Sequence, residues 1–437
     1  MGKARIFLMR GAAAAVIAAL IAGPASTATP TKQVVTGPVA SYWVDTTTSS
    51  GFNMAGMGKG KPSMSSMMGM MSGDASHNVT LTLGSNQVAK TETTGDHLMT
   101  AADLPLYYKR TEAGPAGPAQ PYTPGEQSHE TPKGKILIYW GCGEHAAAGQ
   151  PLVIDLAKIT DPNQRMAMVK QLAPSVNLDT VNKPTPATYK AYGEWPNAKT
   201  NSAFTGQSLT GAHTVKTDYA PQIDFSLSQS QDFLAPIKVS GNQKAASGAV
   251  PLTWAAIPNA KGFVATAIGS GRERDTFVMW TSAASNTGWM GMAPDYLTPG
   301  DIERLTASKV LLPGTATACT VPAEVAGATE GAMYNITAYG GETNLSYPAR
   351  PADPKVAWNI QWTTKIRYRS TTGGLLGQDM GGMNGGMFGM AGQPSEPEEQ
   401  AQPQDNNTGN GDGKKKKKKG GGLFGEIVKQ GVGSLIP

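Results

Sequence analysis

Val79-Thr80-Leu81-Thr82-Leu83 alternates apolar and polar side chains without a break, as a β-strand with one buried face does. Lys135-Ile136-Leu137-Ile138-Tyr139-Trp140 is a short apolar run bounded by glycines, which is typical of a central strand. Outward from these two stretches, we predict further strands at 152–156, 214–216, 222–227, 250–254, 263–268, 276–281, 333–339 and 356–369. Turn residues separate nearly all of them, so the sequence predicts a mainly β fold built from two antiparallel β-sandwich-like units.

Two short helices have start signals in the sequence. Thr298-Pro299-Gly300-Asp301 leads into residues 302–307, and Asp161-Pro162 leads into residues 164–172. In each case a side chain able to cap the helix precedes a proline at the first helical position. We therefore expect short helices to decorate the predicted sheets.

Shifts in composition divide the chain into folded and low-complexity parts. A β-prone segment at 29–51 precedes a Met/Gly-rich tract at 52–75, and a Gly-, Met-, Pro- and Lys-rich segment occupies 371–422. Such compositions cannot build a packed core, so both tracts are predicted to be disordered. Between them we expect β-rich units at 76–181 and 202–370, joined by a linker or long loop at 182–201.

The N-terminus has the pattern of a secretory signal peptide at 1–28. Lys3, Arg5 and Arg10 flank or precede the apolar stretch 11–22, and small residues follow it. This stretch is too short to span a bilayer, and no later stretch approaches the roughly 20 apolar residues that a membrane helix requires. The sequence thus predicts an exported protein, in the periplasm or at the cell surface, without a transmembrane segment.

The net charge of +5 arises from one short segment. Six positive charges form the run Lys414, Lys415, Lys416, Lys417, Lys418 and Lys419, and without them the formal charge is −1. In the following segment 423–437, an α-helix would gather Leu423, Phe424, Ile427 and Val428 on one side. An apolar helix face beside a polybasic run is typical of attachment to an anionic membrane surface. The alternatives are a solvated tail, or docking of the apolar segment on the protein's own folded body or on another envelope protein. Basic and aromatic residues are not interleaved as nucleic-acid binding requires.

The Met/Gly-rich tract contains clustered methionines at Met54, Met57, Met64, Met67, Met68, Met70 and Met71. Thioether sulfur is a soft, neutral ligand that favours Cu(I), so these clusters are candidate copper ligands. No histidine lies among them to hold an oxidised ion. The alternatives are a flexible tether without a cofactor, or a tract of exposed methionines that consumes oxidants or adheres to surfaces.

Two cysteines, Cys142 and Cys319, suit a compartment in which a disulfide persists. Either they form a bridge, or both are buried thiols. Cys142-Gly143-Glu144-His145 also follows the predicted strand at 135–140, where functional loops are common. These residue types can ligate zinc or form a nucleophile with its base, but the remaining histidines lie at no recognisable metal-ligand spacing.

Residues 250–263 carry a local resemblance to a known family. Val250-Pro-Leu-Thr-Trp254, the turn that follows it and the strand beginning at Phe263 resemble a region of fibronectin type III-like β-sandwiches, in which one strand carries a core tryptophan. The alternating stretch Tyr334–Tyr339 is similar to a late strand of such domains. The resemblance covers about residues 245–347 and implies a binding or spacer module without catalytic residues.

Together these features predict an exported, non-enzymatic cell-envelope protein with a binding or structural role, whose flexible tails attach it to an envelope surface or partner. One alternative is a periplasmic soft-metal protein that holds copper with its methionine clusters. A second alternative is an enzyme that uses Cys142 and His145.

Overall fold

The computed structural model describes residues 32–51, 75–100, 102–110, 134–158, 176–200, 204, 206–286 and 293–378. Strands dominate this part of the chain, and helices are few and short. The predicted mainly β fold class is therefore confirmed.

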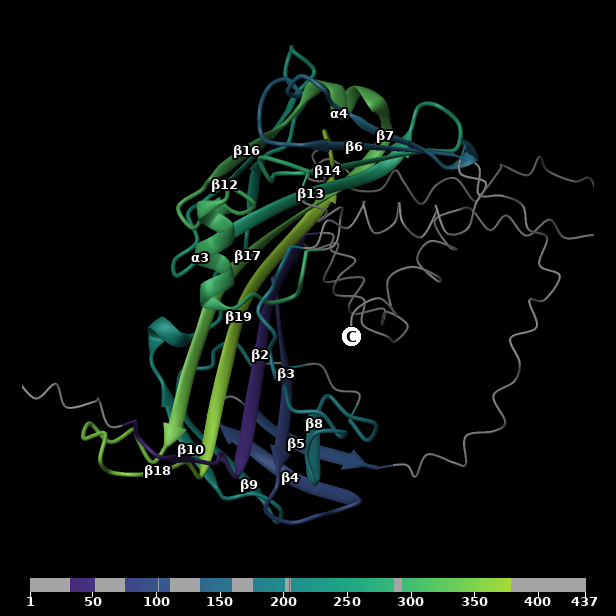
Figure 1. The fold of residues 1–437 in the computed structure, drawn as a ribbon. Coiled ribbons are helices and arrows are strands. Elements are labelled where there is room, and N and C mark those ends of the chain that lie inside the picture. Colours follow the sequence, from purple (N-terminus) through teal and green to yellow (C-terminus); the bar gives the residue numbers. More distant parts are fainter. Residues whose placement is uncertain are drawn as a thin grey trace, which may run out of the picture.

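One sheet of 14 strands forms the body of the described structure (Figure 1). Its strands lie in the order β10 (Ile223–Leu227), β9 (Gly211–Thr217), β4 (Glu92–Met99), β5 (Ala102–Lys109), β8 (Ala191–Trp195), β3 (Ser76–Ser85), β2 (Ala40–Gly51), β19 (Trp362–Leu375), β17 (Thr329–Tyr347), β13 (Gly262–Gly271), β14 (Thr276–Thr281), β6 (Lys135–Trp140) and β7 (Leu152–Asp155). The short strand β15 (Leu312–Pro313) pairs with β13 beside this path. In Figure 1 the long strands β2, β17 and β19 run side by side through the molecule, with β6, β7 and β14 at one end and β4, β5, β8 and β9 at the other.

Two parallel pairings interrupt an otherwise antiparallel sheet. β2 pairs with β19 in parallel, with Asp45 opposite Arg367, and β6 pairs with β14 in parallel, with Ile138 opposite Met279. Parallel neighbours need a long crossover in the chain, and here strands more than 100 residues apart in sequence become neighbours. The two parallel pairs therefore bind distant parts of the sequence into one sheet.

The strand pairing does not follow the boundaries expected from composition. β6 lies in the range expected as the first unit but pairs with β14 from the second, and β8 lies within the expected linker 182–201, where it pairs with β3 and β5. β19 also continues to Leu375, so residues 371–375 are strand rather than linker. Composition and local sequence patterns indicate which segments form strands, but not which strands pair with each other. The expected unit boundaries therefore differ from the observed pairing.

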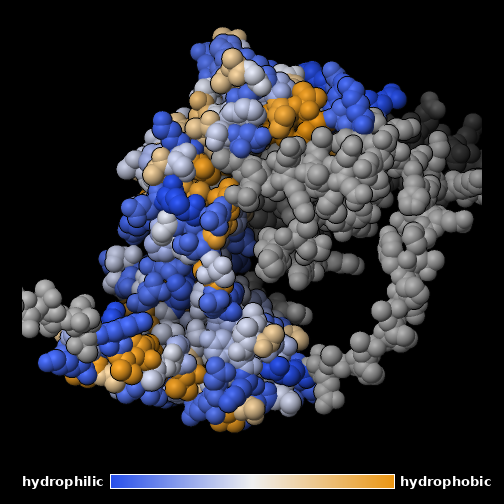
Figure 2. Space-filling model, in the orientation of Figure 1, coloured by the Kyte–Doolittle hydropathy of each residue, from blue (hydrophilic) through white to orange (hydrophobic). Residues whose placement is uncertain are grey.

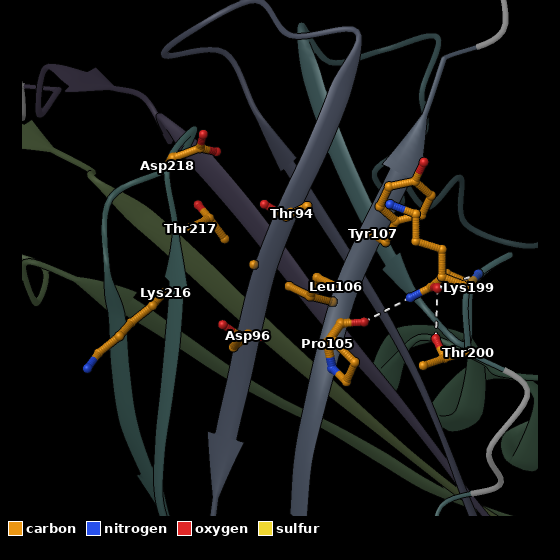
Figure 3. A pocket seen from close by; sticks show the side chains of 12 residues that line it. Thr94, Asp96, Pro105, Leu106, Tyr107, Lys199, Thr200, Lys216, Thr217 and Asp218 are labelled. Atoms are coloured by element: carbon orange, nitrogen blue, oxygen red, sulfur yellow. Dashed lines mark hydrogen bonds between the residues drawn. The ribbon is translucent and has the colours of Figure 1, made fainter.

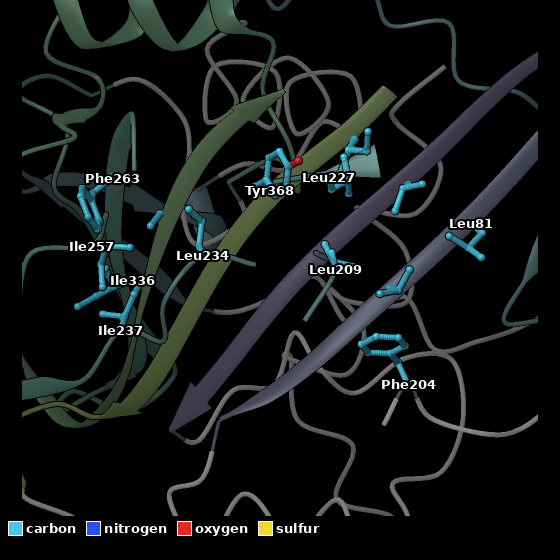
Figure 4. Packing of buried hydrophobic residues seen from close by; sticks show 14 of the residues in the cluster. Leu81, Phe204, Leu209, Leu227, Leu234, Ile237, Ile257, Phe263, Ile336 and Tyr368 are labelled. Carbon is cyan, nitrogen blue, oxygen red and sulfur yellow. The ribbon is translucent and has the colours of Figure 1, made fainter. Parts of the chain in front are cut away.

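A second sheet of three strands, in the order β11 (Val239–Gly241), β12 (Val250–Trp254) and β16 (Ala318–Val321), contributes to the same core. The Trp254 ring lies 5.6 Å from the ring of Phe263 on β13, between the two sheets. Ile336 and Tyr368 extend this core along the large sheet, and Leu209 joins it from a connecting segment (Figure 4). Burial of these apolar side chains is the main force that holds the sheets together.

The helix predicted at residues 302–307 is confirmed as α3 (Pro299–Ala307). The Thr298 hydroxyl accepts a hydrogen bond from the Asp301 amide at 3.0 Å, and Pro299 occupies the first helical turn. The residues of the other predicted helix, 164–172, lie outside the described part of the chain. The remaining elements are α4 (Ala323–Ala328), the 3-10 turns η2 (Leu156–Lys158) and η3 (Gln229–Gln231), and a parallel pair of short strands, β1 (Val35–Thr36) and β18 (Trp358–Asn359).

The described residues contain no helix long and apolar enough to cross a membrane. Exposed apolar side chains, among them Val34, Val35, Tyr347 and Val356, lie around β1 and β18. Figure 2 shows apolar residues at the lower end of the molecule, where β18 lies in Figure 1.

Candidate functional site

Cys142 and Cys319 form a disulfide in the structure. Cys142 lies in the loop after β6, whereas Cys319 is buried on β16 in the three-stranded sheet. The bridge spans 177 residues of sequence and joins the two sheets covalently. The sequence left open either a disulfide bridge or two buried thiols, and the structure has the bridge.

The rest of the Cys142–His145 loop is tied to α4 and β16. The Gly143 amide donates to the Thr320 carbonyl at 2.9 Å, and the Ala146 amide donates to Oε2 of Glu324 at 2.8 Å. Nδ1 of His145 lies 3.1 Å from Oε1 of the same glutamate, in an exposed position. Because Cys142 carries no thiol in this state, the loop provides neither the thiolate nucleophile nor the thiolate metal ligand that its sequence suggested.

The other predicted site residues lie outside the described part of the chain. The methionine cluster from Met54 to Met71 falls within residues 52–74, and the lysine run with the segment 423–437 falls after residue 378. Copper binding by the methionine cluster and surface attachment by the C-terminal segment stay predictions from sequence. Within the described residues, no group of three or more histidine, cysteine or acidic side chains is arranged to hold a metal ion.

A buried ion pair joins β2 to β19. Nε and one terminal nitrogen of Arg367 donate to the two carboxylate oxygens of Asp45 at 2.6 and 2.7 Å, and Nζ of Lys183 donates to Oδ2 at 2.7 Å. Burial by itself raises the pKa of Asp45, but the hydrogen bonds and charges of Arg367 and Lys183 lower it below its usual value. The carboxylate of Asp45 is therefore ionised, and its charge is balanced by Arg367 and Lys183.

Aromatic rings enclose this ion pair. The guanidinium carbon of Arg367 lies 4.8 Å from the Trp43 ring centroid and 4.2 Å from that of Tyr296. The Tyr296 hydroxyl donates to the Thr46 carbonyl at 3.1 Å, which holds the ring over β2. Cation–π contacts of this kind add to the ion pair, so the cluster stabilises the parallel joint between the strands.

A second buried polar network runs through two histidines. The Tyr42 hydroxyl lies 2.8 Å from Nδ1 of His97, whose Nε2 lies 2.9 Å from Nδ1 of His213. Nε2 of His213 lies 2.6 Å from the Leu209 carbonyl, which can only accept. Each neutral imidazole has one donor and one acceptor, so this carbonyl sets the direction of the chain: His213 donates to Leu209, His97 donates to His213, and Tyr42 donates to His97.

This chain requires both histidines to be neutral. Burial lowers the pKa of His97 to about 3, with a smaller contribution from His213, and burial also lowers the pKa of His213. The ring of His213 is stacked on Phe225, with centroids 4.6 Å apart, which adds to its desolvation. We therefore interpret the network as a structural core feature, since neither ring is open to solvent.

The buried histidines make stability depend on pH. Between pH 6.5 and 3 the unfolded chain binds a proton at residue 97 that the folded protein excludes, so stability falls as pH falls through this window. For His97 alone we expect a loss of about 2 kcal/mol between pH 7.5 and pH 5, measured by urea unfolding at each pH.

His97→Gln keeps one donor and one acceptor, and we expect it to flatten this dependence while lowering stability at pH 7.5. His145→Gln removes an exposed imidazole and serves as the matched control, which should keep the wild-type slope. A slope equally steep in His97→Gln and wild type would contradict this account.

The outward face of β4, β5 and β9 carries a groove of about 460 Å³ (Figure 3). Asp96 on β4 lies directly opposite Lys216 on β9, and Thr94 lies opposite Tyr107 on β5. Gly95 lies between the two outward-facing β4 residues. A Cβ atom there would lie 2.4 Å from Cγ2 of Thr217, so only glycine lets β9 approach this closely.

The groove combines paired and unpaired polar groups. The amino group of Lys199 lies 3.6 Å from the Tyr107 ring centroid, and the Tyr107 hydroxyl donates to Glu92 at 2.9 Å. Among the contacts of the described chain, the side chains of Asp96 and Lys216 make no hydrogen bond or ion pair with the protein. A carboxylate on β4 and an ammonium on β9 thus face solvent along the groove, with Tyr107 on β5 at its other side, and these groups are able to bind a polar ligand.

Sequence reasoning missed this groove because its strands are rich in polar residues. β4 has the sequence Glu-Thr-Thr-Gly-Asp-His-Leu-Met, in which the buried positions are Thr93 and His97 rather than aliphatic residues. The signal that could have revealed it is the period-two alternation of exposed Thr94, Asp96 and Leu98. Comparisons with known protein families, characterised proteins and solved structures find no match for this chain.

Proposed function

We propose that the protein is an exported, non-enzymatic protein of the cell envelope whose folded body binds a polyhydroxylated ligand of the carbohydrate class. The observation that carries this proposal is the groove over β4, β5 and β9, where Asp96 and Lys216 lie opposite each other and have no side-chain partner among the described residues. Sugar hydroxyls both donate and accept, so one neutral ligand can donate to the carboxylate and accept from the ammonium. The rest of the lining, with Thr94 and Tyr107, suits the same chemistry.

The disulfide supports the proposed location. Bridges between cysteines persist in oxidising compartments and are rare in the cytosol, and the bridge from Cys142 to Cys319 agrees with the signal-peptide pattern at 1–28. The periplasm and the cell surface both meet this condition.

The strand arrangement supports a module built for binding or spacing rather than catalysis. The sheet β11-β12-β16 faces the four strands β19-β17-β13-β14, and sandwiches of the immunoglobulin and fibronectin type III architecture likewise pack two antiparallel sheets. The resemblance for about residues 245–347 stays a proposal from the sequence. In such folds ligand binding resides in surface features, so function has to be argued from the groove itself.

The C-terminal segment completes the proposal from sequence alone. The lysines 414–419 would be attracted to an anionic membrane surface, and the apolar side of segment 423–437 would insert into that surface. Attachment and ligand binding would then use different parts of the chain, with the folded body held near envelope polysaccharide.

The groove assignment predicts a specific loss of binding in Asp96→Asn. With peptidoglycan sacculi as the probe, we expect the sedimented fraction of this variant to fall at least about threefold, because a charge-assisted hydrogen bond to the carboxylate is lost. Co-sedimentation of the full-length protein at physiological ionic strength measures it.

Asp103→Asn is the matched control, since Asp103 is also an exposed aspartate on the neighbouring strand β5 but lies outside the groove. It should sediment as wild type, and so should a chain shortened after residue 413. Equal sedimentation of Asp96→Asn, Asp103→Asn and wild type would remove the groove from the proposal. Loss of binding only in the shortened chain would assign it to the tail.

A further inference from the structure

Exposed apolar side chains gather on the small parallel ribbon that β1 and β18 form. Four of the nine large apolar side chains exposed in the described chain lie there, each between 49% and 64% exposed. They are Val34, Val35, Tyr347 and Val356. We call residues 32–36 and 347–359 the ribbon patch. Gathered apolar side chains of this kind mark protein or membrane interaction sites, whereas single ones need no explanation.

Hydrogen bonds join the two segments of the ribbon patch into one unit. Val35 is the register partner of Trp358. Nε2 of Gln33 donates to the Val356 carbonyl at 2.9 Å, and Nε of Arg350 donates to Oε1 of the same glutamine at 2.9 Å. The exposed apolar side chains are therefore held in place by a bonded backbone framework.

The ribbon is exposed on both of its faces. Successive residues of an extended chain point to opposite faces, and the neighbours Val34 and Val35 are both exposed. The Val34 carbonyl accepts from the Trp358 amide at 2.8 Å, so both valines belong to the paired stretch. Figure 1 shows β18 at the lower end of β17 and β19, on the outer edge of the molecule. A flat protein partner would cover one face of such a ribbon, whereas a lipid interface can surround both.

The aromatic residues of the patch are of the kind that membrane interfaces favour. The Tyr347 ring is stacked on Trp362, with centroids 5.9 Å apart, and remains more than half exposed. The indole N–H of Trp358 donates to the Pro348 carbonyl at 3.0 Å, so its polar atom is bound within the protein. Tyrosine and tryptophan are enriched where a membrane meets water, because their rings join an apolar body to a polar tip.

The charges of the ribbon patch favour an anionic surface. Its two segments contain three cations, Lys32, Arg350 and Lys355, against one anion, Asp353, and all four residues are exposed. Each cation close to an anionic membrane strengthens binding by about fivefold. We propose that the ribbon patch inserts into the headgroup region of an anionic lipid bilayer, with its apolar side chains buried there and its cations at the lipid phosphates. This contact belongs to the folded body and is separate from the C-terminal segment 423–437.

A fluorophore at the patch tests this contact in the full-length protein. Both native cysteines are joined in the bridge, so Val356→Cys provides one reactive thiol for the environment-sensitive dye NBD. On vesicles of phosphatidylcholine and phosphatidylglycerol, we expect the NBD emission to move to shorter wavelength and to rise at least about twofold, because the dye leaves water. Val153→Cys is the matched control. Val153 is 51% exposed and Val356 50%, but Val153 lies on β7 at the other end of the sheet (Figure 1), where the dye should not respond.

A charged residue on the ribbon tests the affinity of the same protein for these vesicles. We expect Val35→Glu to weaken binding by at least about fivefold, because it replaces an apolar contact with a charge that the anionic surface repels. Val153→Glu makes the same change on β7 and should keep the wild-type affinity. Co-sedimentation of each full-length variant with the vesicles at physiological ionic strength measures the difference.

Four results would overturn the proposal. An NBD response that is equal at positions 356 and 153, or absent at both, would assign vesicle binding to another segment. Equal binding of Val35→Glu and wild type would exclude the ribbon from the contact. A response at position 356 that grows with protein concentration in the absence of vesicles would assign the patch to a second copy of the chain. A response to peptidoglycan sacculi but not to vesicles would assign it to polysaccharide.

The groove at Asp96 is tested separately from the ribbon patch. Asp96→Asn should leave the NBD response at position 356 to vesicles unchanged, and Val35→Glu should leave sacculus binding unchanged. Failure of either proposal can therefore be recognised without the other.

Discussion

Replacing both Cys142 and Cys319 with serine is expected to lower the free energy of unfolding by about 4 kcal/mol. The bridge closes a loop of 177 residues, and cross-links over loops of this length remove a large conformational entropy from the unfolded chain. Urea unfolding of the oxidised wild type and the double variant at pH 7.5, followed by tryptophan fluorescence, measures the difference.

Reduction provides the control for this prediction. Wild-type protein in dithiothreitol should approach the stability of the double variant, whereas the variant itself should not respond to the reductant. Backbone hydrogen bonds such as that from Gly143 to Thr320 remain in the variant, so we expect a destabilised native fold rather than a different one. Coincident unfolding curves for the oxidised wild type and the variant would show that the bridge contributes nothing to stability.

Replacing Arg367 with methionine is expected to cost about 3 kcal/mol. Methionine retains much of the apolar stem between Trp43 and Tyr296 but removes both hydrogen bonds to Asp45, whose side chain is only 6% exposed. Lys183 then remains as the one charged partner of the carboxylate in the described chain. Removing one member of a buried ion pair is strongly destabilising because the other charge stays desolvated.

Two further variants separate this effect from a loss of cation–π contact. Arg350 also lies over a tryptophan ring, 5.4 Å from the Trp358 centroid, but it is exposed and pairs with no buried carboxylate in the described part of the chain. Arg350→Met should therefore cost less than about 1 kcal/mol. Adding Asp45→Asn to Arg367→Met should restore part of the lost stability, because it removes a buried charge that Lys183 alone balances only in part. A double variant no more stable than Arg367→Met would contradict the assignment.

Much of the secondary structure could be predicted from the sequence. β6, β12 and β14 begin and end at the expected residues. Their apolar or alternating sequences are bounded by turn residues, and these patterns depend on only a few neighbouring positions. The start of α3 was equally visible, because Thr298 and Pro299 act on the first turn of the helix that follows them. β4 and β8 were not predicted, because their buried positions include polar residues and glycine that carry little hydrophobic pattern. β5 was not predicted either, because Pro105 stands between its buried residues Leu104 and Leu106 and argues against a strand.

The candidate sites could be predicted only in part. The bridge was one of two states open to the cysteines, because sequence does not give the distance between Cα atoms, which is 5.2 Å in the fold. The sequence around Asp96 marks it only through the alternation of Thr94, Asp96 and Leu98, which does not indicate a ligand. Asp96 becomes a candidate site residue through its cross-strand neighbour Lys216 on β9, which comes from another part of the chain.

The sequence by itself determined the mainly β class, the positions of the apolar strands and the capped start of α3, since all of these depend on interactions within a few residues. The tertiary structure decided which strands became neighbours, including the parallel pairs β2–β19 and β6–β14, and thereby which polar groups were paired, buried or left open. The pairing of these parallel strands depends on burial shared between segments more than 100 residues apart. Asp45 therefore meets Arg367, and Asp96 faces solvent beside Lys216, through contacts that local patterning does not encode.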